Sequence, residues 1–381
     1  MKILMVAIPN HHFFQWVNQL KESGYEVYWF DVTDGGNKVE RIDWVHQIKG
    51  WKLKYDFPLR YSLKNKSPRI YKWIQKHNER KIAAVFEKVL KEIQPDIVHS
   101  FEMRLAGLPI LEVMEQKPNL NFIYSSWGSD IYFYKELGIQ TEQFTRFLKR
   151  VDYLITDCKR DFEIAKKNSF ENVFFGVYPG NGGLTIAEQY IKPINDRNFL
   201  IIKGYEDGVG KALNVIEAIE LLPLTLLEKL EIIIYSTDIV VKERVEKSDF
   251  FASLKVKIYL RGAFISNVDL MQLMGKSVLH IANSISDGMP NVLLEAMGMG
   301  SFPIQTNPGK VSEEVITHGM NGFLIENAFD SAEISKWIKK ALENQELRIT
   351  AQIFNVDFVN KNYNRVNLKQ DIVQLYNGIL S

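Results

Sequence analysis

The sequence predicts an α/β protein with two domains, each built on a parallel β-sheet. Short apolar runs of strand length alternate with amphipathic segments of helical length, which is the pattern of β–α–β units joined by right-handed crossovers. A glycine- and proline-rich segment, residues 179–197, interrupts this alternation near the middle of the chain and predicts a linker. The 381 residues are enough for two domains of ordinary size.

The first domain is expected to span residues 1–178. Apolar runs predict strands at 2–8, 25–31, 95–99, 121–125, 151–156 and 172–175, with helices at 13–22 and 82–93. The loop at 9–12 lacks the G-x-G-x-x-G pattern of dinucleotide-binding folds. Because ligands bind at the carboxyl ends of parallel strands, His11 and His12 in this loop are candidates for a site. Two solvent-exposed loop histidines would explain the pattern equally well.

The second domain, residues 198–355, has the same alternation. Strands are predicted at 199–202, 230–235, 256–260 and 278–282, and helices at 212–221, 267–275 and 290–298, followed by a helical tail. Between the first strand and the first helix lies a glycine-rich loop that runs from Lys203 to Lys211. It is not a Walker A motif, since the glycine spacing differs and no Ser or Thr follows Lys211. A cation at a helix start is nevertheless typical of a place where an anion binds.

A second anion site is predicted at residues 286–298. Pro290 is expected at the first helical position, where its missing N–H has no intrahelical partner anyway. Gly288 allows a sharp turn or a close approach to a ligand. The amides expected to point toward an anion at the positive end of this helix are those of Asn291, Val292 and Leu293.

Two carboxylates, Asp287 and Glu295, flank this helix start. Carboxylates accept hydrogen bonds and suit sugar hydroxyls as partners. An acid, a group of amides and a second acid in this order indicate a nucleoside diphosphate sugar as the ligand.

The segment 287–297, Asp-Gly-Met-Pro-Asn-Val-Leu-Leu-Glu-Ala-Met, resembles the E-G-x-P-x-x-x-x-E-A motif of family 4 retaining glycosyltransferases. Residues 300–304 and 321–325 are similar to that family's G-x-P-V and N-G-x-L segments, and 203–211 is similar to its G-R-x-x-x-x-K-G region. Two positions depart from the pattern: the first acid is Asp287 where the family usually has Glu, and Lys203 stands where it has Arg.

Residues 127–130, Trp-Gly-Ser-Asp, follow the strand at 121–125, at a place where the family often has H-G-S-D. Trp127 replaces the histidine, so the resemblance assigns no histidine role here, whereas Asp130 matches. Asp130 could equally be the N-cap of a following helix.

The resemblance implies the GT-B fold, in which two Rossmann-like domains face a central cleft and the last helix, about 360–381, crosses back to the first domain. It implies a metal-independent retaining hexosyltransferase of bacterial surface-polysaccharide type, which moves a sugar from a nucleoside diphosphate sugar, with UDP favoured over GDP, to a glycan or polyprenyl-linked acceptor. The implied residues are, as catalytic groups, Asp130, Lys211, Asp287 and Glu295; as donor-binding groups, Lys203, Arg261, Gly262, Gly288, Met289, Pro290, Asn291, Val292 and Leu293; and, on the acceptor side, His11 and His12.

Composition narrows the setting. The single Cys158 excludes an internal disulfide and fits a reducing cytoplasm. No segment is long and apolar enough to span a bilayer. No D-x-D, H-E-x-x-H or cysteine cluster predicts a metal site, and we expect no cofactor.

Residues 49–81 carry eleven Lys and Arg side chains against two acids, with aromatic residues interleaved. This pattern favours peripheral contact with an anionic membrane face or with a lipid-linked acceptor. A solvated basic face is the main alternative. The net charge of the whole chain, only +1, disfavours nucleic acid.

Two other functions fit the same motifs. A GT-B nucleotide-sugar 2-epimerase would consume a nucleotide sugar and need no acceptor. A catalytically silent protein would bind the nucleotide sugar without transferring it, a reading that the shorter acid at Asp287 leaves open.

Overall fold

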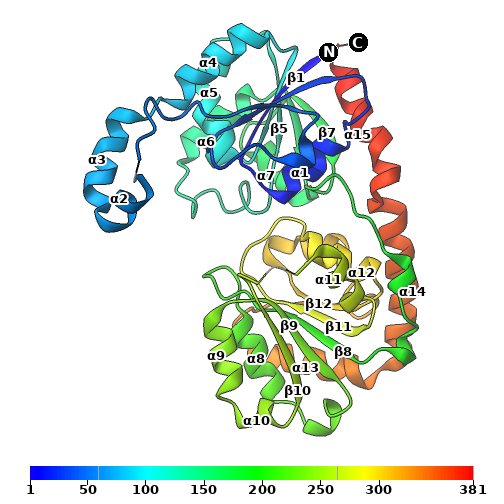
Figure 1. The fold of residues 1–381 in the computed structure, drawn as a ribbon. Coiled ribbons are helices and arrows are strands. Elements are labelled where there is room, and N and C mark those ends of the chain that lie inside the picture. The colour runs from blue at the N-terminus through cyan, green and yellow to red at the C-terminus, as the bar shows by residue number, and fades with distance from the viewer. Residues whose placement is uncertain (59, 264, 381) are drawn as a thin grey trace. The chain divides into compact units, whose positions relative to one another are not determined.

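The computed structural model describes residues 1–58, 60–263 and 265–380 (Figure 1). The chain forms two compact units, and the predicted two-domain α/β class is confirmed. The first unit comprises Met1–Asp157, Asp161–Gly182 and the chain from Lys369 onward, and the second comprises Cys158–Arg160 and Gly183–Leu368.

The first unit is built on a seven-stranded parallel sheet with the strand order β3-β2-β1-β4-β5-β6-β7. Its strands are β1 (Lys2–Ala7), β2 (Glu26–Asp31), β3 (His46–Ile48), β4 (Ile97–Phe101), β5 (Asn121–Ser125), β6 (Tyr153–Thr156) and β7 (Val173–Val177). The central strands β4 and β5 are almost wholly buried, as expected for a parallel sheet covered on both faces. The chain order reverses between β1 and β4, which makes this pair the topological switch point where such sheets bind ligands.

The helices of the first unit are α1 (His11–Asn18), α2 (Arg60–Lys66), α3 (Pro68–Asn78), α4 (Ile82–Ile93), α5 (Leu108–Glu115), α6 (Thr141–Arg150) and α7 (Lys159–Lys167). The predicted bounds of α4 are confirmed. The loop predicted at 9–12 is wrong at its end, because Asn10 is an N-cap whose side chain accepts the Phe13 amide at 2.8 Å. His11 and His12 therefore lie in the first turn of α1.

The second unit contains a six-stranded parallel sheet in the order β10-β9-β8-β11-β12-β13. Its strands are β8 (Phe199–Lys203), β9 (Glu231–Thr237), β10 (Lys255–Leu260), β11 (Ser277–Ala282), β12 (Phe302–Thr306) and β13 (Phe323–Ile325). Its helices are α8 (Ala212–Glu220), α9 (Ile239–Glu246), α10 (Asp249–Ala252), α11 (Asn267–Met274), α12 (Asn291–Gly298), α13 (Ser331–Glu343) and α14 (Gln345–Tyr363). The switch point of this sheet lies between β8 and β11.

The last helix, α15 (Arg365–Leu380), begins in the second unit and packs into the first from Lys369 onward, as predicted. The Tyr376 hydroxyl accepts the indole N–H of Trp16 at 3.0 Å and lies 2.7 Å from Nδ1 of His99. All three side chains are buried. The packing of the first unit thus includes residues from the far end of the sequence.

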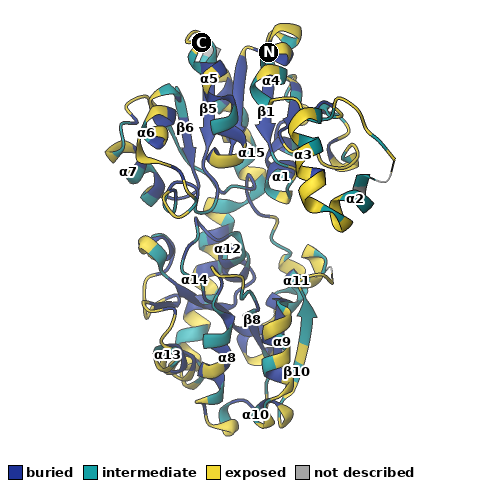
Figure 2. Cartoon of the chain, turned by 90° about the vertical axis from the view of Figure 1, so that its left-hand side faces the viewer, coloured by how far each residue is buried: buried dark blue, intermediate teal, exposed yellow. Residues whose placement is uncertain are grey.

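The helices α2 and α3 extend away from the seven-stranded sheet (Figure 1), and α3 is largely exposed (Figure 2). Across the described ranges, no helix combines the length and the apolar character that crossing a bilayer requires.

Candidate functional site

Two loops meet at the switch point of the second unit. The loop after β8, residues 204–211, lies against residues 283–285, which follow β11. The Lys211 amide donates to the Asn283 carbonyl at 3.0 Å, and the Ile285 amide donates to the Val209 carbonyl at 3.0 Å. The glycine-rich loop and the segment that leads into α12 therefore form one continuous surface at the carboxyl edge of the sheet.

The glycines of the 204–211 loop are needed for close packing. A Cβ on Gly204 would lie 2.7 Å from Cα of Thr237, and one on Gly210 would lie 2.4 Å from the Tyr205 carbonyl oxygen. The carboxylate of Asp207 accepts the amides of Val209 and Gly210. These two amides are therefore already paired with Asp207 within the loop.

Lys203 and Lys211 stand at the two ends of this loop. Lys203 ends β8, with Nζ 4.5 Å from the centre of the Tyr205 ring. Lys211 precedes α8, with Nζ 5.5 Å from the centre of the Phe329 ring. Both are half-buried, and neither forms an ion pair with any carboxylate of the described residues. Two half-buried ammonium groups that form no ion pair with the described carboxylates favour an anionic ligand.

A buried imidazole lies near Lys203. His280, in the middle of β11, is fully buried, and its Nε2 lies 3.0 Å from the Tyr235 hydroxyl. Burial, together with a smaller contribution from the charge of Lys203, lowers the pKa of His280 to about 3. The imidazole is therefore neutral and places no second positive charge beside Lys203. The Tyr235–His280 pair was not predicted from the sequence, although a histidine inside an apolar strand could have indicated it.

The helix α12 begins one residue later than predicted. Pro290 is its N-cap, with extended φ and ψ of −68° and 114°, and Asn291 is the first helical residue. The Leu293 amide donates to the Pro290 carbonyl at 3.0 Å, so the prediction that this amide faces a ligand is wrong. The Met289 and Leu293 side chains are buried in an apolar cluster. In the described structure the Val292 amide has no backbone acceptor.

Asp287 and Gly288 precede this helix. Burial raises the pKa of the Asp287 carboxyl, while Lys203 and the Gly288 amide, which hydrogen-bonds to it, act in the opposite direction. The Asp287 carbonyl accepts Nη2 of Arg160 at 2.8 Å. Sequence reasoning missed Arg160, which is distant in the chain. Asp287 and Lys203, predicted from separate motifs, are thus electrostatic neighbours.

Glu295 lies on α12, one turn beyond Asn291. Its Oε1 accepts Nδ2 of Asn267, the first residue of α11, at 3.1 Å. Burial raises the pKa of Glu295 to about 7, and the Asn267 hydrogen bond and the charge of Arg365 oppose this rise. Asn267 and Arg365 were not predicted. Glu295 is therefore a carboxylate whose charge changes near neutral pH.

Arg261 and Gly262, predicted near the nucleobase, follow β10. Nη1 of Arg261 lies 2.9 Å from Oδ2 of Asp207 and 3.4 Å from Oδ2 of Asp238, and its guanidinium lies 4.0 Å from the centre of the Tyr205 ring. Arg261 thus holds the 204–211 loop to the end of β9. Gly262 is exposed with open space at its Cβ position.

In the first unit, Asp130 is almost completely buried, with 2% of its surface exposed. Its carboxylate accepts the amides of Met103 and Trp127 and the hydroxyl of Tyr124. Burial raises its pKa well above the usual range, and the charge of Glu102 adds to this effect. The next described helix, α6, begins only at Thr141, so Asp130 is not a helix N-cap. With three donors bound, Asp130 fixes the loop after β5.

The two histidines differ in environment. His11 is exposed, with Nδ1 3.2 Å from Nη1 of Arg41. His12 is half-buried, and its ring centre lies 6.3 Å from that of Trp127. Burial lowers the pKa of His12 to about 4, with a smaller contribution from His11. His12 is therefore neutral at physiological pH.

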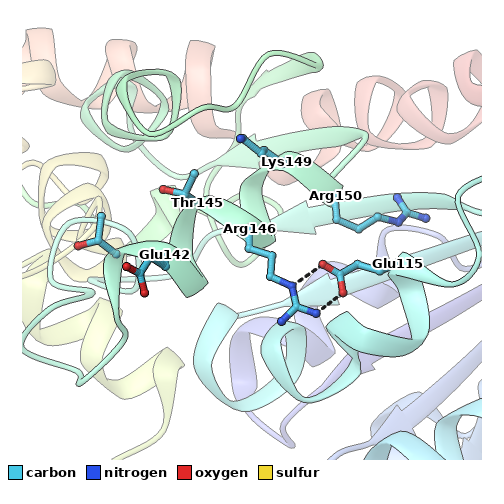
Figure 3. Close-up of a pocket in the computed structure, with 7 residues that line it drawn as sticks. Glu115, Glu142, Thr145, Arg146, Lys149 and Arg150 are labelled. Atoms are coloured by element: carbon cyan, nitrogen blue, oxygen red, sulfur yellow. Dashed lines mark hydrogen bonds and ion pairs between the residues drawn. The ribbon is translucent and has the colours of Figure 1, made fainter.

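A separate hollow of about 610 Å³ lies beside α6, next to the end of α5 (Figure 3). Arg146 forms a two-bond ion pair with Glu115 there, while the guanidinium of Arg150 is held by the backbone carbonyls of Met114, Lys117 and Leu120. None of the predicted site residues lines this hollow. Its two arginines are already paired, so we assign it no role.

One group of described side chains has the ligand types of a metal site. Asp157, Cys158 and Asp161 are buried, and their ligand atoms lie within 4.8 Å of one another. Each of the three already interacts with other parts of the protein, and an acidic cluster by itself does not define a site. We therefore assign no metal to it.

Two family models match the chain. Residues 2–158 match the family described as glycosyl transferase 4-like, and residues 193–352 match glycosyl transferases group 1. Together they span most of both units. A search among curated proteins found no significant match.

Solved structures share the fold over the whole chain. HepE from Anabaena, crystallised with UDP, is 13% identical, with a TM-score of 0.70 over 99% of this chain and 100% of that one. A sucrose-phosphate synthase from Thermosynechococcus elongatus is 13% identical, with a TM-score of 0.72 over 100% and 99%. A glycosyltransferase from Rickettsia africae is 16% identical, with a TM-score of 0.64 over 100% and 98%. The fold is GT-B, and with the two family models it defines the chain as a glycosyltransferase.

Proposed function

We propose that this protein is a metal-independent retaining hexosyltransferase of family 4, which takes its sugar from a UDP-sugar. The observation that carries the proposal is the pair of half-buried lysines, Lys203 and Lys211, at the switch point of the second unit, with the Asp287 carboxyl near Lys203. That unit matches the group 1 glycosyltransferase model. The structural neighbour HepE has been crystallised with UDP and with UDP-glucose, which supports uracil as the base.

Each residue has a role that follows from its chemistry. Lys203 and Lys211 bind the diphosphate and stabilise the negative charge that grows on it as the sugar leaves, with help from the amide end of α12. Glu295 accepts hydrogen bonds from the ribose hydroxyls, and Asp287 accepts one from the sugar. The Lys203 charge near Asp287 favours the ionised carboxylate that this role needs.

A thermal-shift panel tests the nucleotide site. With UDP, GDP, ADP, CMP and NAD, in EDTA, we expect only UDP to raise the unfolding midpoint. A ligand at about 100 times its dissociation constant stabilises the folded protein by about 2.7 kcal/mol, which is on the order of 5 to 10 °C for a domain of this size. No shift with any nucleotide would overturn the proposal, and a shift that needs added Mg²⁺ would overturn its metal independence.

Turnover then separates the alternatives. Transfer or slow hydrolysis releases UDP from the UDP-sugar. A 2-epimerase would consume the UDP-sugar without releasing UDP. A silent protein would bind the UDP-sugar and catalyse neither reaction. Released UDP is the expected result.

We propose that the acceptor is a glycan or polyprenyl-linked hydroxyl in surface-polysaccharide synthesis, reached at the cytoplasmic face of the membrane through α3. On this helix Ile70 and Trp73 are 55% and 67% exposed and lie one turn apart. Arg69, Lys72 and Lys76 adjoin them, and no acid lies within α3. Exposed apolar side chains flanked by cations are the pattern of an interfacial helix.

Vesicle co-sedimentation tests this contact. We expect binding to vesicles that contain phosphatidylglycerol and little binding to pure phosphatidylcholine. Each lysine near an anionic surface contributes about 1 kcal/mol, so Lys72→Ala with Lys76→Ala should weaken binding by roughly 30-fold. The control is Lys247→Ala with Lys339→Ala, two exposed lysines at the end of α9 and on α13. An equal loss in the control pair, or equal binding to both vesicle types, would contradict a role for α3.

A further inference from the structure

The helix α14 has an apolar face on each of its two sides. Ala351 and Val359, on the inner side, are buried among the apolar clusters of the second unit. The outer side carries exposed residues at intervals of three or four, which places them in one stripe along the helix. This outer stripe consists of Glu346, Ile349, Thr350, Ile353, Phe354, Asp357 and Lys361.

The middle of the outer stripe is apolar. Ile353 and Phe354 are 69% and 51% exposed, and Ile349 lies one turn before Ile353. Single exposed apolar side chains are ordinary, whereas a group of them with a polar rim marks an interaction surface. The two ends of the stripe are charged, with Glu346 at one end and Lys361 at the other. The outer stripe therefore has the apolar centre and polar rim of a protein interface.

A hollow of about 370 Å³ lies beside the outer stripe, between the start of α14 and the loop that precedes β13. Met320, Leu347 and Phe354 give it an apolar lining, and Met320 is 63% exposed. Among the described residues that line it, only Glu346 is charged. A long side chain with an apolar stem and a positive end fits such a hollow.

This surface is separate from the nucleotide site. The loop before β13 lies at the amino edge of the second sheet, because all of the strands in that sheet are parallel. The loops that carry Lys211 and Asp287 follow strands and lie at the carboxyl edge. The outer stripe therefore requires an occupant other than the sugar donor.

The outer stripe is complementary in charge to a second copy of itself. A two-fold axis that crosses α14 midway between Ile353 and Phe354 places a second α14 antiparallel to the first. Glu346 and Lys361 are equally far from this axis along the helix, so each carboxylate faces the ammonium group of the other copy. In the described part of the chain, neither Glu346 nor Lys361 has an ion-pair partner.

The same axis pairs the remaining polar groups of the stripe. Thr350 and Asp357 are also equally far from it, so a hydroxyl that can donate faces a carboxylate that accepts. A parallel arrangement would instead set Glu346 against Glu346 and Lys361 against Lys361, and like charges repel. The two acids of the stripe also disfavour an anionic membrane as the occupant, in contrast to α3, which contains no acid.

We propose that the outer stripe of α14 is the interface of a homodimer, in which the two α14 helices pack antiparallel and Lys361 of the partner subunit enters the hollow beside Glu346. The interface is isologous, so every contact occurs twice. This inference does not depend on the proposed function. One pair of helices is smaller than a standard protein interface, so the dimer should dissociate reversibly on dilution.

Analytical ultracentrifugation of the full chain tests the proposal. Between about 1 and 200 µM, a range that brackets a weak interface, we expect the average mass to rise from that of a monomer toward that of a dimer. Ile353→Asp should be monomeric throughout, because it places two facing carboxylates at the centre of the apolar contact. The control is Ile239→Asp on α9, where the isoleucine is 67% exposed and lies outside the stripe. This control should dimerise like the unmodified protein.

Charge reversal tests the antiparallel arrangement. Glu346→Lys and Lys361→Glu should each raise the dissociation constant by roughly 10-fold or more, because each sets like charges opposite one another at both ends of the interface. The combined variant should return close to the unmodified value, since opposite charges face each other again. Circular dichroism and the unfolding midpoint of the monomer should be unchanged in all of these variants.

Three outcomes would overturn the proposal. They are a chain that stays monomeric at the highest concentration, a dimer that Ile353→Asp leaves intact, and a combined charge variant that dimerises no more tightly than the two single variants. None of them bears on UDP binding, which the thermal-shift panel tests separately.

Discussion

Lys211→Ala should lower turnover of the UDP-sugar by a factor on the order of 100 to 1000 while the fold survives. Lys211 precedes α8, where the positive end of the helix dipole makes a cation unfavourable unless an anion binds. In the described structure its ammonium has an aromatic neighbour, Phe329, and no carboxylate. Removing the Lys211 ammonium should therefore change the stability of the fold little. It should destabilise the transition state, because the departing diphosphate loses a positive charge that stabilises it. Steady-state release of UDP measures the effect.

The matched control is Lys247→Ala, an exposed lysine at the end of α9 that is paired with Glu243 one turn earlier. It should leave turnover unchanged, because exposed pairs of this kind contribute little. Near-normal turnover in Lys211→Ala, with a normal unfolding midpoint, would remove Lys211 from the site.

Glu295→Ala should also lower turnover by a factor on the order of 100 to 1000. The pH dependence of UDP affinity in Glu295→Gln should show whether the charge of Glu295 is the reason. The Glu295 carboxylate accepts hydrogen bonds from ribose hydroxyls at full strength only when it is ionised. Because burial raises its pKa to about 7, the UDP affinity of the unmodified protein should weaken as the pH falls through 7. The affinity of Glu295→Gln should be low and vary little with pH. Titration calorimetry between pH 5.5 and 8.5 measures both.

The free energy of unfolding should fall as the pH rises toward 7, whereas the UDP affinity should increase. Between the ordinary pKa of 4.5 and about 7, folded Glu295 holds a proton that the unfolded chain has released, so this group lowers the free energy of unfolding as the pH rises through that window. Glu295→Gln should therefore unfold at a higher temperature than the unmodified protein at pH 8, and at nearly the same temperature at pH 4.5. A destabilised Glu295→Gln at pH 8 would show that the charge is structural.

Much of the fold could be predicted because buried parallel strands are continuous apolar runs. The strands missed have local reasons. β12 contains Pro303, which lacks the amide that a central strand normally uses, and β3 and β13 contain only three residues each. The end of the first loop was missed because the capping role of Asn10 was not recognised.

The site was predictable where its residues are neighbours in sequence and hidden where they are not. Asp287 and Glu295 are carried by one motif. Asn267, which binds Glu295, lies 28 residues away, and Arg160 reaches Asp287 from 127 residues away. The hydrogen bond from the Gly210 amide to Asp207 was not predicted from the sequence.

The contact between Tyr376 and the first unit has a consequence for synthesis of the chain. The indole N–H of Trp16 and the imidazole of His99 lack their hydrogen-bond partner until Tyr376 is translated. Tyr376 comes 194 residues after Gly182 (376 − 182), where the first unit's chain stops before it resumes at Lys369. At about 5–20 residues per second, this delay is roughly 10 to 40 seconds. During that time the nascent first unit lacks its contact with α15, and the second unit is synthesised before that contact can form.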